Sequence, residues 1–162
     1  MPYRRLVLWS GIFLLALAGC KQAPPNIILI NVDDMGWRDV GFMGSEFYET
    51  LHIDRLAGQG MVFTNAYATA SNCAPSRACL MSGQWTPRHG IYTVSSSERG
   101  RSEDRKLIPT ANTTVLADTF ITLAEVLRDE GYHTCHAGKW HLGDDPRTQG
   151  FDVNIGGTRA GS

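Results

Sequence analysis

Apolar positions follow two periodicities along the chain beyond residue 25. Residues 26–32 (Asn-Ile-Ile-Leu-Ile-Asn-Val) form a continuous apolar, β-branched run, which is typical of a strand buried on both faces. Two later segments also predict strands, at residues 61–67 and 132–137. Three segments have helical spacing, at residues 53–59, 74–81 and 119–130. Strands that alternate with helices predict an α/β domain with a largely parallel sheet.

The segment 119–130 has the clearest amphipathic pattern. Its apolar face comprises Phe120, Leu123, Ala124 and Leu127, and Gly131 is the expected end of the helix. Residues 95–114, rich in Ser, Arg, Glu, Asp, Thr and Asn, predict a surface segment that we call the polar excursion.

Four polar residues come directly after predicted strands: Asp33, Asp34, Lys139 and His141. Ligands of parallel α/β sheets bind beyond the carboxyl ends of the strands. We therefore expect these side chains to converge.

Composition narrows the class of protein only slightly. A chain of 162 residues with a formal net charge of −1 predicts one globular domain. This charge gives no electrostatic reason to expect a nucleic acid or an anionic membrane surface as a partner.

Residues 1–19 predict a signal peptide. Arg4 and Arg5 precede an apolar stretch, residues 6–17, that is too short to span a bilayer comfortably. The following Leu17-Ala18-Gly19-Cys20 resembles the bacterial lipobox, which implies cleavage before Cys20 and its lipidation. An ordinary secretory signal with an incidental cysteine is the alternative.

Residues 20–25 then predict a lipidated cysteine and a short linker. Lys21 is not the Asp that marks retention in the inner membrane, so an exported protein anchored to the outer membrane by lipid is favoured. Three cysteines remain: Cys73, Cys79 and Cys135. An odd number argues against a simple disulfide framework, while a pair between Cys79 and Cys135 stays open.

The strongest local signal is Cys73-Ala74-Pro75-Ser76-Arg77-Ala78-Cys79-Leu80-Met81-Ser82-Gly83. Cys73 lies where a helix begins, a position at which free N–H groups favour an anion. Arg77 follows one helical turn later and can reach the same place.

This string resembles the signature of the formylglycine-dependent sulfatases. The resemblance implies that a maturation enzyme oxidises Cys73 to formylglycine. One hydroxyl of its gem-diol attacks the sulfur of a sulfate ester and expels the alcohol. The second hydroxyl then loses its proton, and sulfate is eliminated as the aldehyde returns.

Two further motifs extend the resemblance. Asp33 and Asp34 offer oxygen donors that suit Ca²⁺, and in sulfatases such a pair supplies half the metal shell together with the residue at Cys73. Gly138-Lys139-Trp140-His141-Leu142-Gly143 resembles a motif whose Lys binds sulfate and whose His activates formylglycine. Lys139 and His141 are assigned these roles, whereas His89 and Asp152 are expected to be structural.

The resemblance covers residues 26–162 and implies the alkaline-phosphatase-like sandwich, here only its N-terminal portion. The second metal-binding pair of the family lies downstream, so we expect the 162 residues alone to lack activity. The implied partners are a sulfated small molecule or polysaccharide and the maturation enzyme. A phosphonate or phosphodiester hydrolase using formylglycine, and a lipoprotein that binds sulfated glycans without cleaving them, remain alternatives.

Overall fold

The computed structural model describes residues 23–160. The predicted signal peptide and Cys20 lie outside this range. The chain divides into two compact units, one that ends at Val32 and one that begins at Asp33, which are described separately. In the described part, no helix is both long and apolar enough to cross a membrane.

The described part of the first unit, residues 23–32, is exposed throughout and contains no strand. The predicted buried strand over residues 26–32 is therefore wrong for this structure. Ile28 and Ile30, for example, are 85% and 73% exposed. A strand needs a neighbour to complete its backbone hydrogen bonds, and no described segment provides one.

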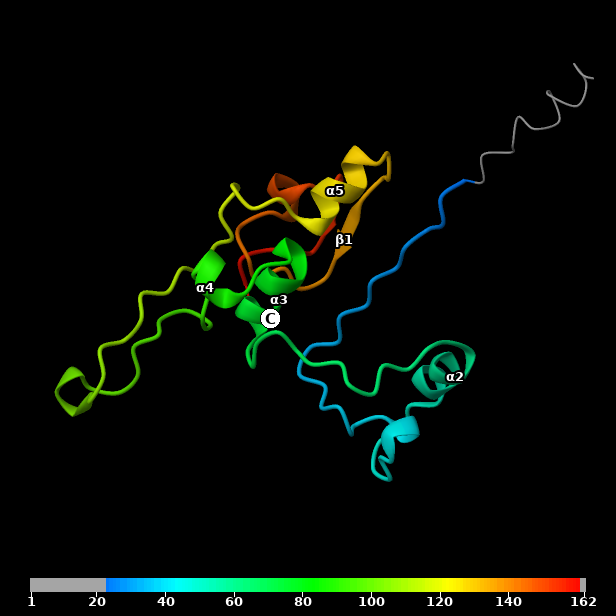
Figure 1. Cartoon of the computed structure of the whole chain (residues 1–162), viewed down its shortest axis with the longest axis horizontal. Helices are drawn as coiled ribbons and strands as arrows, with labels where there is room; N and C mark the ends of the chain where they lie inside the picture. The colour runs from blue at the N-terminus through cyan, green and yellow to red at the C-terminus, as the bar shows by residue number, and fades with distance from the viewer. Residues whose placement is uncertain (1–22, 161–162) are drawn as a thin grey trace, which may run out of the picture. The chain divides into compact units, whose positions relative to one another are not determined.

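The second unit is an assembly of short elements joined by long loops (Figure 1). Its α-helices are α2 (Leu51–Gln59), α3 (Cys73–Ser82), α4 (Thr86–His89) and α5 (Leu123–Asp129). Its 3₁₀ helices are η1 (Gly41–Met43), η2 (Ser102–Asp104) and η3 (Pro146–Gln149). Its strands are β1 (Cys135–Ala137) and β2 (Val153–Ile155).

The predicted helices are present because local signals define their ends. The side chain of Asn72 caps α3, and Gly83 ends this helix in the left-handed region with a φ of 64°. Thr122 and Glu125 form a reciprocal capping box at the start of α5. This box explains why α5 begins at Leu123 rather than at Thr119.

The strand predicted over residues 61–67 is absent, because the chain turns at Thr64 and Asn65. Its apolar side chains are exposed, with Phe63 at 73% and Tyr67 at 84%. β1 lies within the strand predicted at residues 132–137, whereas β2 was not predicted; the two pair in parallel, with Cys135 opposite Val153 and Ala137 opposite Ile155. The fold is thus α/β, with a small parallel sheet.

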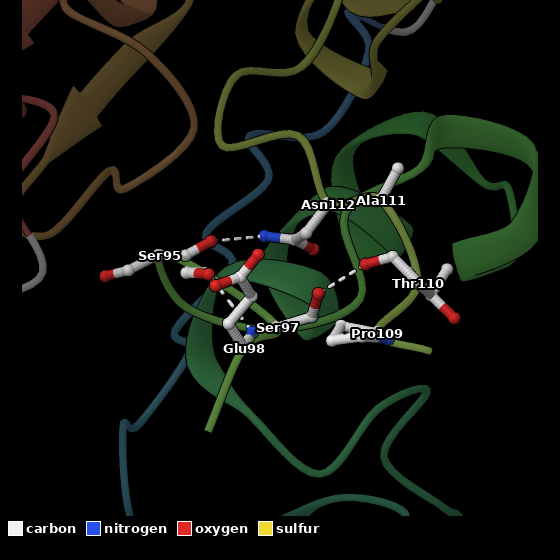
Figure 2. Close-up of a pocket in the computed structure, with 8 residues that line it drawn as sticks. Ser95, Ser97, Glu98, Pro109, Thr110, Ala111 and Asn112 are labelled. Atoms are coloured by element: carbon white, nitrogen blue, oxygen red, sulfur yellow. Dashed lines mark hydrogen bonds between the residues drawn. The ribbon is translucent and has the colours of Figure 1, made fainter. Parts of the chain in front are cut away.

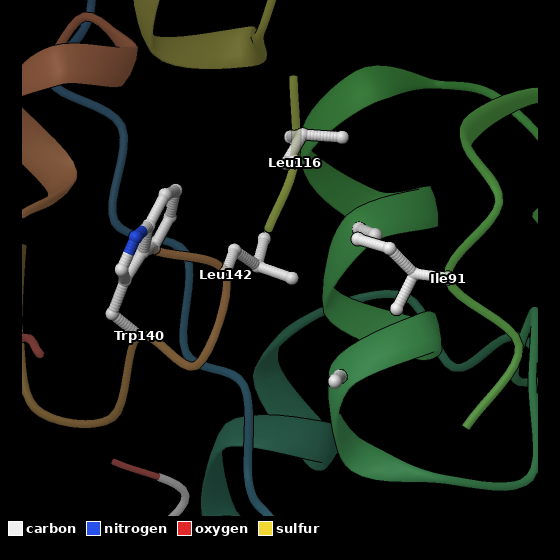
Figure 3. Close-up of a cluster of buried hydrophobic side chains, with 6 residues drawn as sticks. Ile91, Leu116, Trp140 and Leu142 are labelled. Atoms are coloured by element: carbon white, nitrogen blue, oxygen red, sulfur yellow. The ribbon is translucent and has the colours of Figure 1, made fainter. Parts of the chain in front are cut away.

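A small apolar core joins α3 to the segment after β1. It contains six buried residues: Ala74, Ala78, Ile91, Leu116, Trp140 and Leu142. Figure 3 shows Leu142 between Trp140 and Ile91. Because Trp140 and Leu142 flank His141 in the chain, burial of these two side chains holds the intervening backbone in place.

Asp152 connects the two strand regions. It accepts hydrogen bonds from the Thr134 N–H at 2.8 Å and from the Thr134 hydroxyl at 3.2 Å. These bonds, chiefly the one from the Thr134 N–H, lower the pKa of Asp152 below its ordinary value of 3.8. Asp152 is therefore a structural residue in this fold.

We expect Asp152 to make the stability of the fold depend on pH. A carboxyl whose pKa is lower in the folded state stabilises the fold above pH 3.8 and loses this effect as the pH falls through its folded pKa. Asp152→Asn should lower the urea midpoint at about pH 7, and its difference from wild type should shrink at about pH 3. Asp129→Asn, at the exposed end of α5, is the control and should change neither midpoint. An equal deficit of Asp152→Asn at both pH values would contradict this role.

A buried Cys–His pair links α3 to α4. The Cys79 Sγ lies 3.3 Å from His89 Nε2, and both residues are 5% exposed. The Ile91 N–H donates to His89 Nδ1 at 3.1 Å, so the neutral ring carries its proton on Nε2, facing the sulfur. Burial lowers the pKa of His89, which favours this neutral form. Cys79 and Cys135 are both free thiols, which answers the question of their pairing.

Cys79→Ala should lower the free energy of unfolding by about 1–3 kcal/mol, because the His89 Nε2–H would be buried without an acceptor. Cys79→Ser keeps an acceptor and should recover part of the loss. Cys135→Ala removes an exposed thiol and should change stability by less than about 0.5 kcal/mol. Urea unfolding of the three variants measures this, and equal losses for Cys79→Ala and Cys135→Ala would sink the assignment.

Candidate active site

Cys73 is the first residue of α3, and Asn72 holds it there. The Asn72 Oδ1 accepts a hydrogen bond from the Cys73 N–H at 3.1 Å and lies 3.9 Å from its Sγ. Cys73 is half-buried and free. A group at this position faces the positive end of the helix dipole, which stabilises negative charge.

Two carboxylates lie beside Cys73. Asp33, Asp34 and Cys73 each place a ligand atom within 4.8 Å of the other two. The chain turns sharply here, since Asp34 has a φ of 55°, and this turn brings neighbouring carboxylates to the same place. Two hard oxygen donors and one further donor form part of a shell for a cation such as Ca²⁺.

Asp33 is also contacted by two cations. The Arg77 Nη2 lies 3.2 Å from its Oδ1, and the Lys139 Nζ contacts its Oδ2. The Arg77 Nη1 donates to the Lys139 carbonyl oxygen at 2.5 Å, which ties α3 to the segment after β1. The side chains of Arg77 and Lys139 are only 12% and 18% exposed.

The ion pairs fix the charges of these groups. The hydrogen bond from Lys139, with Arg77 as a further partner, lowers the pKa of Asp33. The same bond raises the pKa of Lys139, and the negative charge of Asp33 adds to the effect. At neutral pH the site therefore presents a carboxylate, an ammonium and a guanidinium side by side.

His141 is held on a strained backbone near this cluster. Its φ is 65°, and its N–H donates to the Thr158 carbonyl oxygen at 3.0 Å. Its Nδ1 is buried and has no hydrogen-bond partner among the described residues. Burial, and then the charges of Lys139 and Arg77, lower the pKa of His141, so its ring is neutral at pH 7.

The convergence predicted from the sequence is present for Asp33, Asp34 and Lys139, and Arg77 and Cys73 join them. His141 is linked to the cluster by the effect of the Lys139 and Arg77 charges on its pKa, and its Nδ1 makes no hydrogen bond among the described residues. Asn72 was missed, although an Asn directly before a predicted helix is a strong capping signal.

Comparison with known proteins places these residues in a family. The family model described as Sulfatase matches residues 25–160. The chain is 36% identical over 156 residues to the dog (Canis lupus familiaris) N-acetylgalactosamine-6-sulfatase, covering 91% of this chain and 29% of the relative. It is 39% identical over 158 residues to mouse (Mus musculus) arylsulfatase G, covering 91% and 27% of the two chains.

The chain also resembles solved structures in its fold. The crystal structure of Ps i-CgsB superposes with a TM-score of 0.66 at 36% identity, over 82% of this chain and 28% of that one. A second structure of Ps i-CgsB, in complex with k-i-k-neocarrahexaose, gives a TM-score of 0.61 at 33% identity, over 77% and 27% of the two chains. The chain thus spans less than a third of the length of each of these relatives.

Proposed function

Because the chain belongs to the sulfatase family, we propose that the full-length protein hydrolyses sulfate esters, with formylglycine made from Cys73 as nucleophile. The observation that carries the proposal is the cluster of Asp33, Asp34 and Cys73, with Lys139 and Arg77 bound to Asp33. An anionic ester placed at Cys73 would meet two cations and the N-terminus of α3.

Formylglycine supplies a hydrated aldehyde, one hydroxyl of which displaces the alcohol from sulfur while the other later expels sulfate. The position of Cys73 suits this role because it is the first residue of α3, where developing negative charge is stabilised. Asn72 fixes the backbone of this residue through its hydrogen bond to the Cys73 N–H.

Lys139 and Arg77 bind the sulfate oxygens in this proposal. Their side chains are mostly buried and are held by Asp33, so little conformational entropy is lost when the ester binds. Their positive charges also offset the charge that accumulates on the oxygens in the transition state.

His141 takes the proton that leaves the nucleophilic hydroxyl. A neutral imidazole is required for this step, and burial together with Lys139 and Arg77 keeps the pKa of His141 low. The strained backbone of His141, flanked by the buried Trp140 and Leu142, fixes where the ring can lie.

The donor set fits Ca²⁺ in part. Asp33 and Asp34 would hold the ion together with the residue at position 73. When bound, Ca²⁺ would polarise the sulfate oxygens as a Lewis acid. Three donors are fewer than the roughly six to eight that Ca²⁺ takes, so carbonyl oxygens, water or further residues of the full-length protein would complete the shell.

We further propose that the protein acts on a sulfated glycan outside the cytoplasm. Support for the substrate comes from the neocarrahexaose complex of Ps i-CgsB and from the name of the dog relative. Support for export comes from the lipobox-like sequence that ends at Cys20, which predicts a lipid anchor. Residues 73–77 would be read by the maturation enzyme before catalysis.

Two measurements test the proposed function. Mass spectrometry of the peptide that contains Cys73, from protein made in its native host, should show the aldehyde in place of the thiol. The matured full-length protein should hydrolyse an aryl sulfate faster than the matching aryl phosphonate or phosphodiester. An unmodified thiol would indicate a binding protein, and faster phosphorus chemistry would indicate the other class of hydrolase.

A further inference from the structure

The polar excursion, residues 95–114, encloses a hollow that the proposed chemistry does not use. The hollow lies between residues 95–98 and residues 109–112 and has a volume of about 370 Å³ (Figure 2). This is near the lower end of the about 300–1,000 Å³ typical of small-molecule sites. It is lined by Ser95, Ser96, Ser97, Glu98, Pro109, Thr110, Ala111 and Asn112.

Hydrogen bonds across the hollow hold its two walls together. The Asn112 Nδ2 donates to the Ser95 carbonyl oxygen at 2.5 Å and to the Thr93 carbonyl oxygen at 3.1 Å. Its Oδ1 accepts from the N–H groups of Tyr92 and Thr93 at 2.6 and 3.0 Å. The Ser97 hydroxyl donates to the Thr110 carbonyl oxygen, as Figure 2 shows. The walls are therefore preorganised although they belong to a loop.

The remaining polar groups of the hollow suit a neutral ligand rich in hydroxyls. Among the described residues, the hydroxyls of Ser95 and Thr110 have no hydrogen-bond partner. The Glu98 carboxylate, whose charge is balanced by Arg105 at 3.3 Å, can accept hydrogen bonds from vicinal hydroxyls. The lining contains no Lys or Arg, and the guanidinium of the adjacent Arg99 is bound to the carbonyl oxygens of Ser96 and Glu98.

The hollow is connected to the candidate active site. The Asn72 Nδ2 donates to the Thr93 hydroxyl at 3.1 Å, and Asn72 is the residue that caps α3 beside Cys73. Thr93 in turn is bound through its backbone to Asn112, which lines the hollow. Two hydrogen-bonded steps thus link the wall of the hollow to the residue that positions Cys73.

We propose that this hollow binds an uncharged sugar residue next to the sulfated one. The choice of a glycan rests on the proposed function, but the binding does not require hydrolysis. The hydroxyls of Ser95 and Thr110 and the carboxylate of Glu98 hydrogen-bond the sugar hydroxyls, and Pro109 and Ala111 offer an apolar surface to its C–H face.

A desulfated carrageenan hexasaccharide is the probe, titrated by calorimetry into the full-length protein that carries Cys73→Ala. The variant Thr110→Val with Glu98→Gln should bind it roughly three- to tenfold more weakly for each group removed. Thr114→Val, in the same excursion but outside the hollow, is the matched control and should bind as the parent does. Hydrogen exchange of the parent should show protection by the probe at residues 95–98 and 109–112.

Absence of binding, protection elsewhere, or equal affinity of the double variant and Thr114→Val would overturn the proposal. Because the protein in this test lacks the nucleophile, the result is independent of hydrolysis. If the protein did not hydrolyse sulfate esters, the uncharged probe would still bind to the hollow. If the hollow did not bind the probe, hydrolysis of an aryl sulfate would be unchanged.

Discussion

Replacing Cys73 by Ala is expected to abolish hydrolysis of sulfate esters by the full-length protein. The substitution removes the atom from which formylglycine is made while keeping α3, because Ala is a good helix former and the Asn72 cap bonds the backbone N–H. Loss of a covalent nucleophile lowers kcat by about 10⁴-fold or more. The measurement is release of the phenol from an aryl sulfate at saturating substrate.

Cys135→Ala is the matched control for Cys73→Ala. It removes an exposed thiol from β1 and should leave kcat unchanged. The Cys73→Ala protein should also keep its melting temperature, since the side chain is only half-buried. Substantial hydrolysis by Cys73→Ala at an unchanged melting temperature would show that another residue is the nucleophile.

Asp33→Asn is expected to weaken the binding of Ca²⁺ strongly, which is the second largest effect that we predict. Asn keeps the shape of the side chain but removes the charge that holds Lys139 and Arg77 and that would bind Ca²⁺. Loss of a residue that merely supports a metal ligand costs about 10–100-fold in affinity, so loss of a ligand should cost at least about 100-fold. The readout is the rise in melting temperature of the full-length protein on titration with Ca²⁺.

Two comparisons make the Asp33 result specific. Glu46→Gln removes an exposed carboxylate that lies outside the cluster and should leave the Ca²⁺ titration unchanged. Asp34→Asn removes the neighbouring donor without touching the ion pairs and should weaken Ca²⁺ binding as well. If Asp33→Asn responded to Ca²⁺ as wild type does, the assignment of Asp33 as a ligand would be wrong.

The three longer helices, α2, α3 and α5, were predictable from the sequence because their signals are local, whereas the four-residue α4 was not predicted. Asn72 and Gly83 delimit α3 within a dozen residues, and Thr122 with Glu125 fixes the start of α5. Strands depend on partners far along the chain, which a local pattern cannot supply. The apolar runs at residues 26–32 and 61–67 therefore look like strands in sequence but are unpaired in the described part of the chain.

The site was predictable for a different reason. Asp33, Arg77 and Lys139 lie in separate segments; the position of Asp33 and Lys139 after predicted strands indicated that these two meet, and the motifs that match a family in order added Arg77. The buried pair of Cys79 and His89 escaped prediction, because nothing in the spacing of these residues shows that their side chains point at each other. The hollow in the polar excursion escaped for the same reason.

The burial of α3 bears on when Cys73 could be oxidised relative to folding. Ala74, Pro75 and Ala78 are buried against the core once α3 has folded, and Arg77 is then held by Asp33. An enzyme that reads residues 73–77 as a linear string needs to grip these same side chains. Under the proposed function, oxidation of Cys73 would have to come before folding, and a chain that folds first would keep the thiol. In that case the relative rates of maturation and folding would set the yield of active protein, and slower folding would raise this yield.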